Sequence, residues 1–310
     1  MSRLRPSFLP ALVAASLLLT FGAAVAAAAP LPSGPIRVID DVGQHIVLGH
    51  PARRIVAIEP SNAEIVLALG LKARLVGVDQ SSFQYTPPPW RARLQGVHSI
   101  GNSYPAASEE AIVATHPDLV LAATGVNGLG GLRALGIPVV ILDPRSVAGI
   151  YHDIRLVGRL TGTLSRARQL VHHMQAQVAA ITRRVRTQAR HRPTVFYDLG
   201  GLYTAGPKSF IDSLIRLAGG VNVADRMSSA AYPHVTAEQV VAADPRIIIV
   251  DPDATTVAKE EKLPGFSTLS AVRHHRVYAL PDSAYVNEPS MALVGGLEEL
   301  VRIFHPHVKP

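Results

Sequence analysis

Two tyrosines at matched positions in the two halves of the sequence could hold a flat ligand between them. Residues 103–122 and 231–250 align without a gap, and Tyr104 and Tyr232 lie 128 residues apart, each directly before a proline. A tyrosine ring removes flat apolar area from water at little entropic cost, and its phenol can donate a hydrogen bond. The period far exceeds that of a solenoid unit, so the repeat predicts two related lobes with a ligand-binding cleft between them.

A glutamate recurs in the same repeat. Glu110 and Glu238 are also 128 residues apart, and each falls in the first turn of a predicted helix, where a carboxylate complements the helix dipole. Glu109 and Gln239 could support those helix starts without them. The matched pair therefore has either a stabilising role or a shared contact with a partner.

Thirteen histidines raise the question of metal binding. Three groups stand out: His172-His173, His274-His275 and His305-Pro-His307. None has a carboxylate or a third histidine at ligand spacing, so we expect solvated histidines and no metal site. The glycines of residues 125–130 have the reverse of the dinucleotide-binding spacing, so no cofactor is expected. The chain also lacks a Gly-x-Ser-x-Gly elbow and a His-Glu-x-x-His pair, which argues against a secreted hydrolase and against any enzymatic activity.

Strands that alternate with capped helices must position these residues. Residues 36–50 suit a hairpin, and further strands are predicted at residues 54–58, 75–78, 118–122, 139–142, 195–197, 247–250 and 276–279. Ser61-Asn-Ala-Glu64 is interpreted as a capping box and Ser209-Phe-Ile-Asp212 as a similar helix start, with Gly70 and Gly219-Gly220 as the stops. The alternation in both halves predicts an α/β fold with two lobes and mainly parallel sheets.

One long helix is predicted between the lobes. Apolar residues from Leu170 to Val185 recur at helical spacing, within a helix that runs roughly from Ser165 to Arg190. Because bending such a helix breaks backbone hydrogen bonds, we expect only modest lobe closure on ligand binding. The predicted division is a signal peptide (1–28), an amino-terminal lobe (36–160), a bridging helix (161–192) and a carboxy-terminal lobe (193–310).

The amino terminus is typical of a secretory signal. Arg3 and Arg5 precede an apolar stretch from Ala11 to Ala29 that ends in small residues. The chain has no cysteine, so neither a disulfide nor a cysteine-linked lipid anchor is expected, which points to a periplasmic location. The net charge of +7 falls to about +5 without the signal, too small and scattered an excess to indicate nucleic-acid binding.

Five segments of the chain are specific when taken together. They are RIVAIEPSNAEI at 54–65, EAIVATHPDLV at 110–120, YTAGPKSFID at 203–212, LAGGVNV at 217–223 and TAEQV at 236–240. On these segments the chain resembles, from about Val38 to His307, the periplasmic substrate-binding proteins of the helical-backbone class. That family serves ABC importers of cobalamin, haem and ferric siderophores. The resemblance implies two Rossmann-like lobes joined by the long helix, a ligand held in the groove, and no chemistry performed.

Within the family the chain looks closest to the cobalamin-binding branch. The resemblance implies that four tyrosines flank a corrin-like ligand from both lobes: Tyr104, Tyr203, Tyr232 and Tyr285. Trp90, in a proline-rich loop, is expected to overhang the groove. One departure is that the branch has a further tryptophan after its third strand, where this chain has Ala123 or Thr124.

The resemblance also implies partners. Glu110 and Glu238 would enter arginine pockets, one on each transmembrane subunit of a permease dimer, and the carrier would work as a monomer. The ligand would be a small-molecule metal chelate, with a ferric siderophore or haem as alternatives to a corrinoid. A haem carrier would use Tyr104 with His98 or His234 as axial ligands, although residues 100–104 lack the Gly-Tyr start expected of the haem branch.

Overall fold

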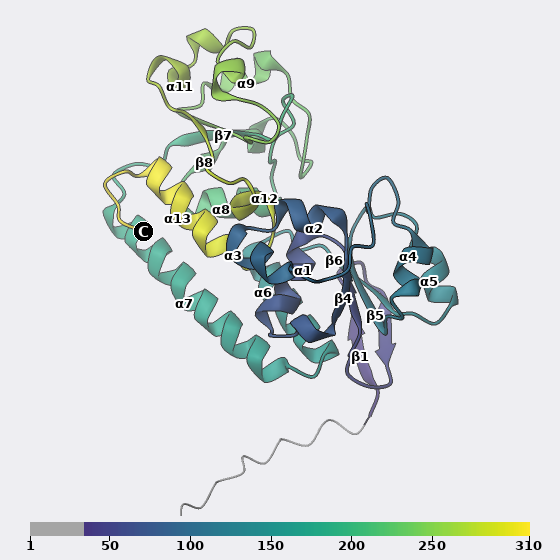
Figure 1. Cartoon of the computed structure of the whole chain (residues 1–310). Helices are drawn as coiled ribbons and strands as arrows, with labels where there is room; N and C mark the ends of the chain where they lie inside the picture. The colour runs from purple at the N-terminus through teal and green to yellow at the C-terminus, as the bar shows by residue number, and fades with distance from the viewer. Residues whose placement is uncertain (1–33) are drawn as a thin grey trace, which may run out of the picture. The chain divides into compact units, whose positions relative to one another are not determined.

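The computed structural model describes residues 34–310 (Figure 1). The predicted signal peptide lies outside these described residues. Within them, no helix is both long enough and apolar enough to cross a membrane.

The amino-terminal lobe is built on a parallel sheet with the strand order β4-β3-β5-β6. Its strands are β3 (Ile55–Ala57), β4 (Leu75–Val78), β5 (Leu119–Ala123) and β6 (Val139–Leu142). The predicted hairpin is confirmed as the antiparallel pair β1 (Ile36–Ile39) and β2 (His45–Leu48). Burial alternates along both hairpin strands, as expected when one face packs on a core and the other meets water.

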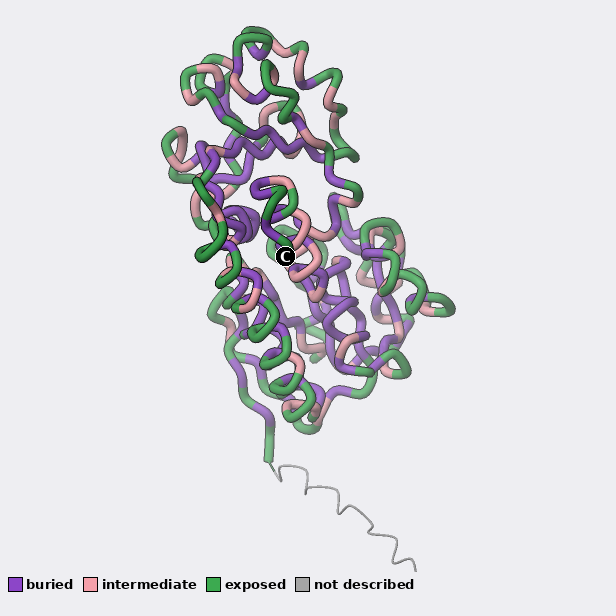
Figure 2. The backbone as a smooth tube through the Cα atoms, turned by 90° about the vertical axis from the view of Figure 1, so that its left-hand side faces the viewer, coloured by how far each residue is buried: buried purple, intermediate pink, exposed green. Residues whose placement is uncertain are grey.

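The carboxy-terminal lobe repeats this topology. Its parallel sheet has the order β10-β9-β7-β8, with β7 (Thr194–Asp198), β8 (Val221–Asn222), β9 (Ile247–Val250) and β10 (Val277–Ala279). Counted along the chain, both sheets have the order second, first, third, fourth. Most strand residues of both sheets are buried (Figure 2). The predicted fold class, two α/β lobes with parallel sheets, is confirmed, while the short strand β8 was not predicted.

Helices fill the connections between the strands. Their bounds are α1 (Pro60–Ala68), α2 (Gln80–Tyr85), α3 (Pro88–Arg91), α4 (Glu109–Ala114), α5 (Gly130–Ala134), α6 (Val147–Leu160), α7 (Leu164–Gln188), α8 (Phe210–Leu217), α9 (Ala237–Ala243), α10 (Val257–Glu260), α11 (Ser270–Arg273), α12 (Ala284–Asn287) and α13 (Leu293–Phe304). Helix α4 joins the second and third strands of its sheet, and α9 does the same in the other lobe. The two helices therefore occupy equivalent places.

The long helix α7 links the two lobes in sequence, from the end of α6 to the start of β7. Its buried residues alternate at spacings of four and three: Ala167, Val171, Met174, Val178, Ile181 and Val185. This stripe packs against α6 and α13, which lie beside α7 in Figure 1. The predicted bridging helix is confirmed, and it packs on an element from each half of the chain.

The predicted helix starts have mixed outcomes. Ser209 caps α8 and Thr236 forms a full capping box with Gln239 at the start of α9. The capping box predicted at Ser61 is wrong, because α1 begins one residue earlier at Pro60. Proline is favoured at the first helical position, where its missing N–H costs nothing. Glu64 is instead fully buried on α1.

Candidate ligand-binding site

Three large aromatic side chains are half exposed in loops that follow strands of the two sheets. Tyr104, Tyr203 and Tyr232 have exposed fractions of 52%, 55% and 52%. Tyr104 precedes α4 and Tyr232 precedes α9, so the two occupy matched places in the two lobes. In open α/β sheets, ligands bind in the loops beyond the carboxyl ends of the strands. The half-exposed rings are therefore available to a ligand rather than committed to a core.

Tyr104 lies among carboxyl groups. Its phenol lies beside the Glu59 carboxyl, and the other charges acting on it belong to Asp79 and Glu288. Burial, followed by the Glu59 carboxylate, raises the pKa of Tyr104 to about 12. Burial and then Asp79 raise the pKa of Glu59 to about 7. The Tyr104 ring is therefore surrounded by acceptors, and its phenol stays protonated at neutral pH.

Asp79 organises this side of the site. The fully buried carboxylate accepts hydrogen bonds from the Ser82 hydroxyl at 2.6 Å, the Ser103 hydroxyl at 2.8 Å and the Glu59 backbone N–H at 3.1 Å. Ser103 is the residue before Tyr104, so its bond fixes where the Tyr104 loop leaves the sheet. Glu59 has a backbone φ of 89°, a region that side-chain-bearing residues rarely adopt. Strain of this kind is concentrated at functional sites.

Two further acidic residues, Glu64 and Glu288, lie near Glu59 and Asp79. Glu64 on α1 faces Ser290 and the backbone of Met291 and Ala292, and burial raises its pKa to about 8. Neither Glu64 carboxyl oxygen accepts a hydrogen bond of ordinary geometry from any described residue. Burial, Glu59 and Glu64 raise the pKa of Glu288 to about 8. The segment after α12 therefore brings Glu288 near Glu59 and Glu64 of the amino-terminal lobe, and burial with these neighbours favours its protonated form.

These raised pKa values predict an unusual dependence of stability on pH. The folded-state pKa values of Glu59, Glu64 and Glu288 are about 7, 8 and 8 against an ordinary value of 4.5, so the folded chain binds more protons than the unfolded chain. Stability should therefore be greatest below about pH 5 for these groups and fall as pH rises to about 8. Thermal unfolding across this range measures the effect. The buried-site variant Glu64→Gln should flatten the slope, and an unchanged slope would contradict the assignment.

Tyr232, in the carboxy-terminal lobe, also lies near Glu288. Its phenol lies near the Phe210 backbone, and the charges acting on it include Asp143, Arg145 and Glu288. Arg145 donates two hydrogen bonds to Asp143, at 2.9 and 3.0 Å, just after β6 of the amino-terminal lobe. Tyr104 and Tyr232 therefore share Glu288 as a neighbouring charge, one tyrosine from each lobe.

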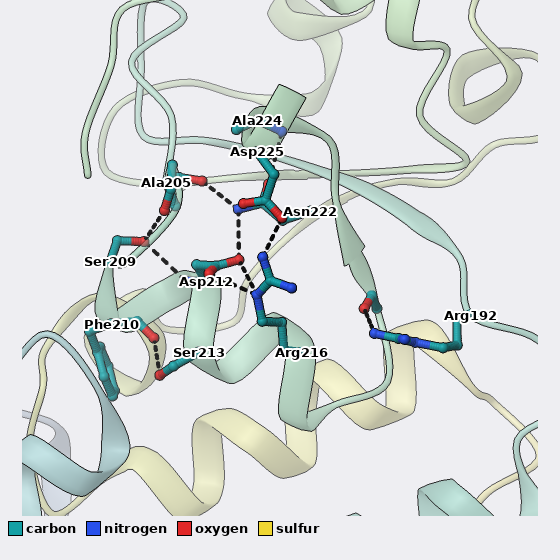
Figure 3. Close-up of polar contacts among 12 residues, drawn as sticks. Arg192, Ala205, Ser209, Phe210, Asp212, Ser213, Arg216, Asn222, Ala224 and Asp225 are labelled. Carbon is teal, nitrogen blue, oxygen red and sulfur yellow. Dashed lines mark hydrogen bonds and ion pairs between the residues drawn. The ribbon is translucent and has the colours of Figure 1, made fainter. Parts of the chain in front are cut away.

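Tyr203 is held by a rigid loop of the carboxy-terminal lobe. Its ring meets the His234 ring edge to face with centroids 4.9 Å apart, and the two residues form a β-bridge. The Asn222 side-chain amide donates to the Ala205 carbonyl at 2.7 Å and to Asp212 at 3.1 Å, as Figure 3 shows. The same Asp212 carboxylate accepts from Arg216. This network fixes the loop from Tyr203 to the start of α8.

The other two predicted aromatic residues lie in different surroundings. Tyr285 is on α12, and its ring lies against Gly295 of α13 in a pocket shared with Leu280 and Arg302. Trp90 on α3 is half-buried against the core, with the Arg93 guanidinium 5.0 Å from its ring centroid. Neither residue is among the groups that act on the phenols of Tyr104 and Tyr232. Their roles as ligand contacts stay predictions.

The carboxyl cluster of Glu59, Asp79 and Glu288 was not found from the sequence. Asp79 follows β4, and Glu288 lies more than 200 residues further along the chain. The sequence marks only one part of this cluster: Pro60 directly follows Glu59, in the turn after β3 where Glu59 has a positive φ and α1 begins.

Glu110 and Glu238 are exposed on α4 and α9. Glu109 is engaged elsewhere, because its carboxylate accepts from the Gly131 N–H at 2.7 Å. Glu110 accepts only from the Ser108 hydroxyl, at 3.1 Å, among the described residues. Hydrogen bonds from its own backbone and from Thr236 lower the pKa of Glu238, so that side chain is ionised. The two carboxylates are presented to solvent at equivalent places of the two lobes.

Comparison with known proteins adds to this geometry. A family model for periplasmic binding proteins matches residues 55–284, from β3 to α12. A cobalamin-binding protein of Halobacterium salinarum is 32% identical over 315 residues, covering 95% of this chain and 84% of that protein.

Two solved structures share the fold closely. The periplasmic haem-binding protein of Roseiflexus sp. RS-1, in its apo form, has a TM-score of 0.73 and 28% identity, covering 82% of this chain and 98% of that chain. A protein of an ABC-type Fe3+-hydroxamate transport system from Saccharomonospora viridis has a TM-score of 0.73 and 26% identity, covering 87% and 99%. The likeness therefore extends over both lobes.

Proposed function

We propose, because this chain belongs to the periplasmic binding protein family, that it captures a cobalamin-like corrinoid between Tyr104 and Tyr232 and delivers it to an ABC importer. The chain is a binding protein and not an enzyme. In this proposal the mature protein works in the periplasm as a monomer, and a permease dimer receives the ligand.

The observation that carries the choice of ligand is the kind of ionisable group around the Tyr104 ring. Tyr104 has only carboxyl groups among the charges that act on it, namely Glu59, Asp79 and Glu288. A corrinoid has a flat apolar face for the rings and a periphery of carboxamides, which donate hydrogen bonds to carboxylates. The propionates of haem and the acidic groups of many ferric siderophores would find no cationic partner among the groups that act on Tyr104.

The haem alternative requires axial ligands that this arrangement disfavours. Burial and the Glu59 carboxylate raise the pKa of Tyr104 to about 12, which opposes formation of the tyrosinate that a haem iron would need. The His234 ring is already in contact with Tyr203. Haem is named for one structural neighbour and an Fe3+-hydroxamate transport system for the other, so the test separates all three ligands.

The protein purified from its own host provides the direct test. Native mass spectrometry and the absorption spectrum should show one corrinoid per chain. Titration of the ligand-free protein with cyanocobalamin, haemin and a ferric hydroxamate should show stoichiometric binding of the first, with the ligand recovered unchanged. A haem absorption band in the purified protein, or saturable binding of the hydroxamate alone, would contradict the corrinoid assignment.

A further inference from the structure

Three potential metal ligands meet outside the tyrosine site. Asp41 lies in the turn between β1 and β2, while His152 and Asp153 are neighbours on α6. Ligand atoms of the three side chains all lie within 4.8 Å of one another, and the His152 Nε2 atom is 4.0 Å from an Asp41 carboxylate oxygen. Asp41 lies more than 100 residues before the other two, so sequence spacing could not reveal the group.

Asp153 is the unusual member of the group. It is fully buried, and neither of its carboxyl oxygens accepts a hydrogen bond from any residue within 34–310. An unpartnered buried carboxylate costs several kcal/mol unless a proton or a cation compensates its charge. Its carboxyl faces that of Asp41, and the ligand atoms of the two side chains lie within 4.8 Å of each other. Something positive must therefore sit between the two acids, either a proton or a metal ion.

Asp41 is already held in position for such a contact. One of its carboxylate oxygens accepts from the Asp143 N–H at 2.7 Å, and its own N–H donates to the Ile141 carbonyl at 3.2 Å. The adjacent Asp40 accepts from the Ile141 N–H at 3.1 Å. These bonds tie the hairpin turn to β6, so the remaining Asp41 oxygen is directed toward α6 without further ordering.

We propose that Asp41, His152 and Asp153 bind a divalent transition-metal ion of the zinc class, which clamps the amino-terminal hairpin to α6. One imidazole nitrogen and two carboxylate oxygens are a donor set that zinc accepts in tetrahedral sites, with water in the fourth position. Calcium and magnesium prefer oxygen donors alone and more of them. The His152 side chain is 60% exposed, so it is free to turn toward the ion.

The competing arrangement is a proton shared by Asp41 and Asp153. Zinc titration of the full mature chain, after treatment with a chelator and removal of the chelator, separates the two. The metal site predicts one tight zinc ion per chain and a rise in the thermal unfolding midpoint with zinc, with no such rise for calcium or magnesium. A shared proton predicts neither effect, and its observation would overturn the proposal.

Substitutions of the proposed ligands test whether the zinc ion binds at these residues. His152→Ala changes an exposed side chain, and Asp153→Asn keeps the size of a buried one, so both should fold. Each should weaken the tight zinc step at least tenfold and remove the zinc-dependent rise in midpoint. His173→Ala, an exposed histidine on α7, is the matched control and should bind as the parent does. Equal zinc affinity in His152→Ala, Asp153→Asn and the parent would overturn the proposal.

Discussion

Replacing both Glu110 and Glu238 with arginine is expected to abolish ligand uptake while leaving ligand affinity unchanged. The two carboxylates are exposed at equivalent places, on α4 and α9, and Glu109 already bonds to Gly131. In the proposed complex each would pair with a cationic pocket of one permease subunit. Close charge pairs that lose water at an interface couple strongly, and reversing one partner turns attraction into repulsion.

Reconstituted vesicles that contain the permease measure this effect. Uptake and carrier-stimulated ATP hydrolysis should both be lost in the double variant, while each single variant should retain part of the activity. Glu261→Arg, a charge reversal on the carboxy-terminal lobe outside the repeated helices, is the control and should transport normally. Normal uptake by the double variant would refute the docking role, and a parallel loss of ligand affinity would trace the defect to the carrier itself.

Tyr104→Ala and Tyr232→Ala are each expected to weaken ligand binding by about 1–3 kcal/mol, roughly 5- to 150-fold. Both rings are half exposed without ligand, so binding would bury the remaining area and truncation would lose it. Because neither ring belongs to the buried cores, the unfolding midpoint should change little.

Phenylalanine variants separate the two contributions of each tyrosine. Tyr104→Phe and Tyr232→Phe keep the ring, so calorimetry should show that most of the affinity remains. A large loss in the phenylalanine variants would assign the binding energy to the phenol groups instead. Unchanged affinity in both alanine variants would refute the placement of the ligand between these rings.

Regular elements were predictable where a local pattern was long enough. The strands at 75–78, 139–142 and 247–250 were predicted with the observed bounds, since each is a short apolar run between turn residues. Strand β8 has two residues and no such run. The start of α1 was predicted wrongly from Ser61, although Pro60 directly before it was a competing signal for the first helical position.

The surroundings of the site were less accessible to sequence reasoning. The repeat correctly related Tyr104 to Tyr232 as matched positions of two lobes with the same strand order. It could not predict that Glu59, Asp79 and Glu288 gather around Tyr104, because no spacing rule links residues brought together only by packing. Aspartate and glutamate are also mostly exposed in proteins, so a reading of the sequence by residue type places them in solvent.

Each sheet is complete within its own half of the chain, so the two sheets can form one after the other during folding. The first sheet needs only residues 55–142, and the second only residues 194–279. The strands of the amino-terminal sheet can therefore pair before those of the other lobe are available. Helix α13 must wait, because it packs on both α7 and α8. The last helix of the chain thus completes a hydrophobic core that runs through both lobes.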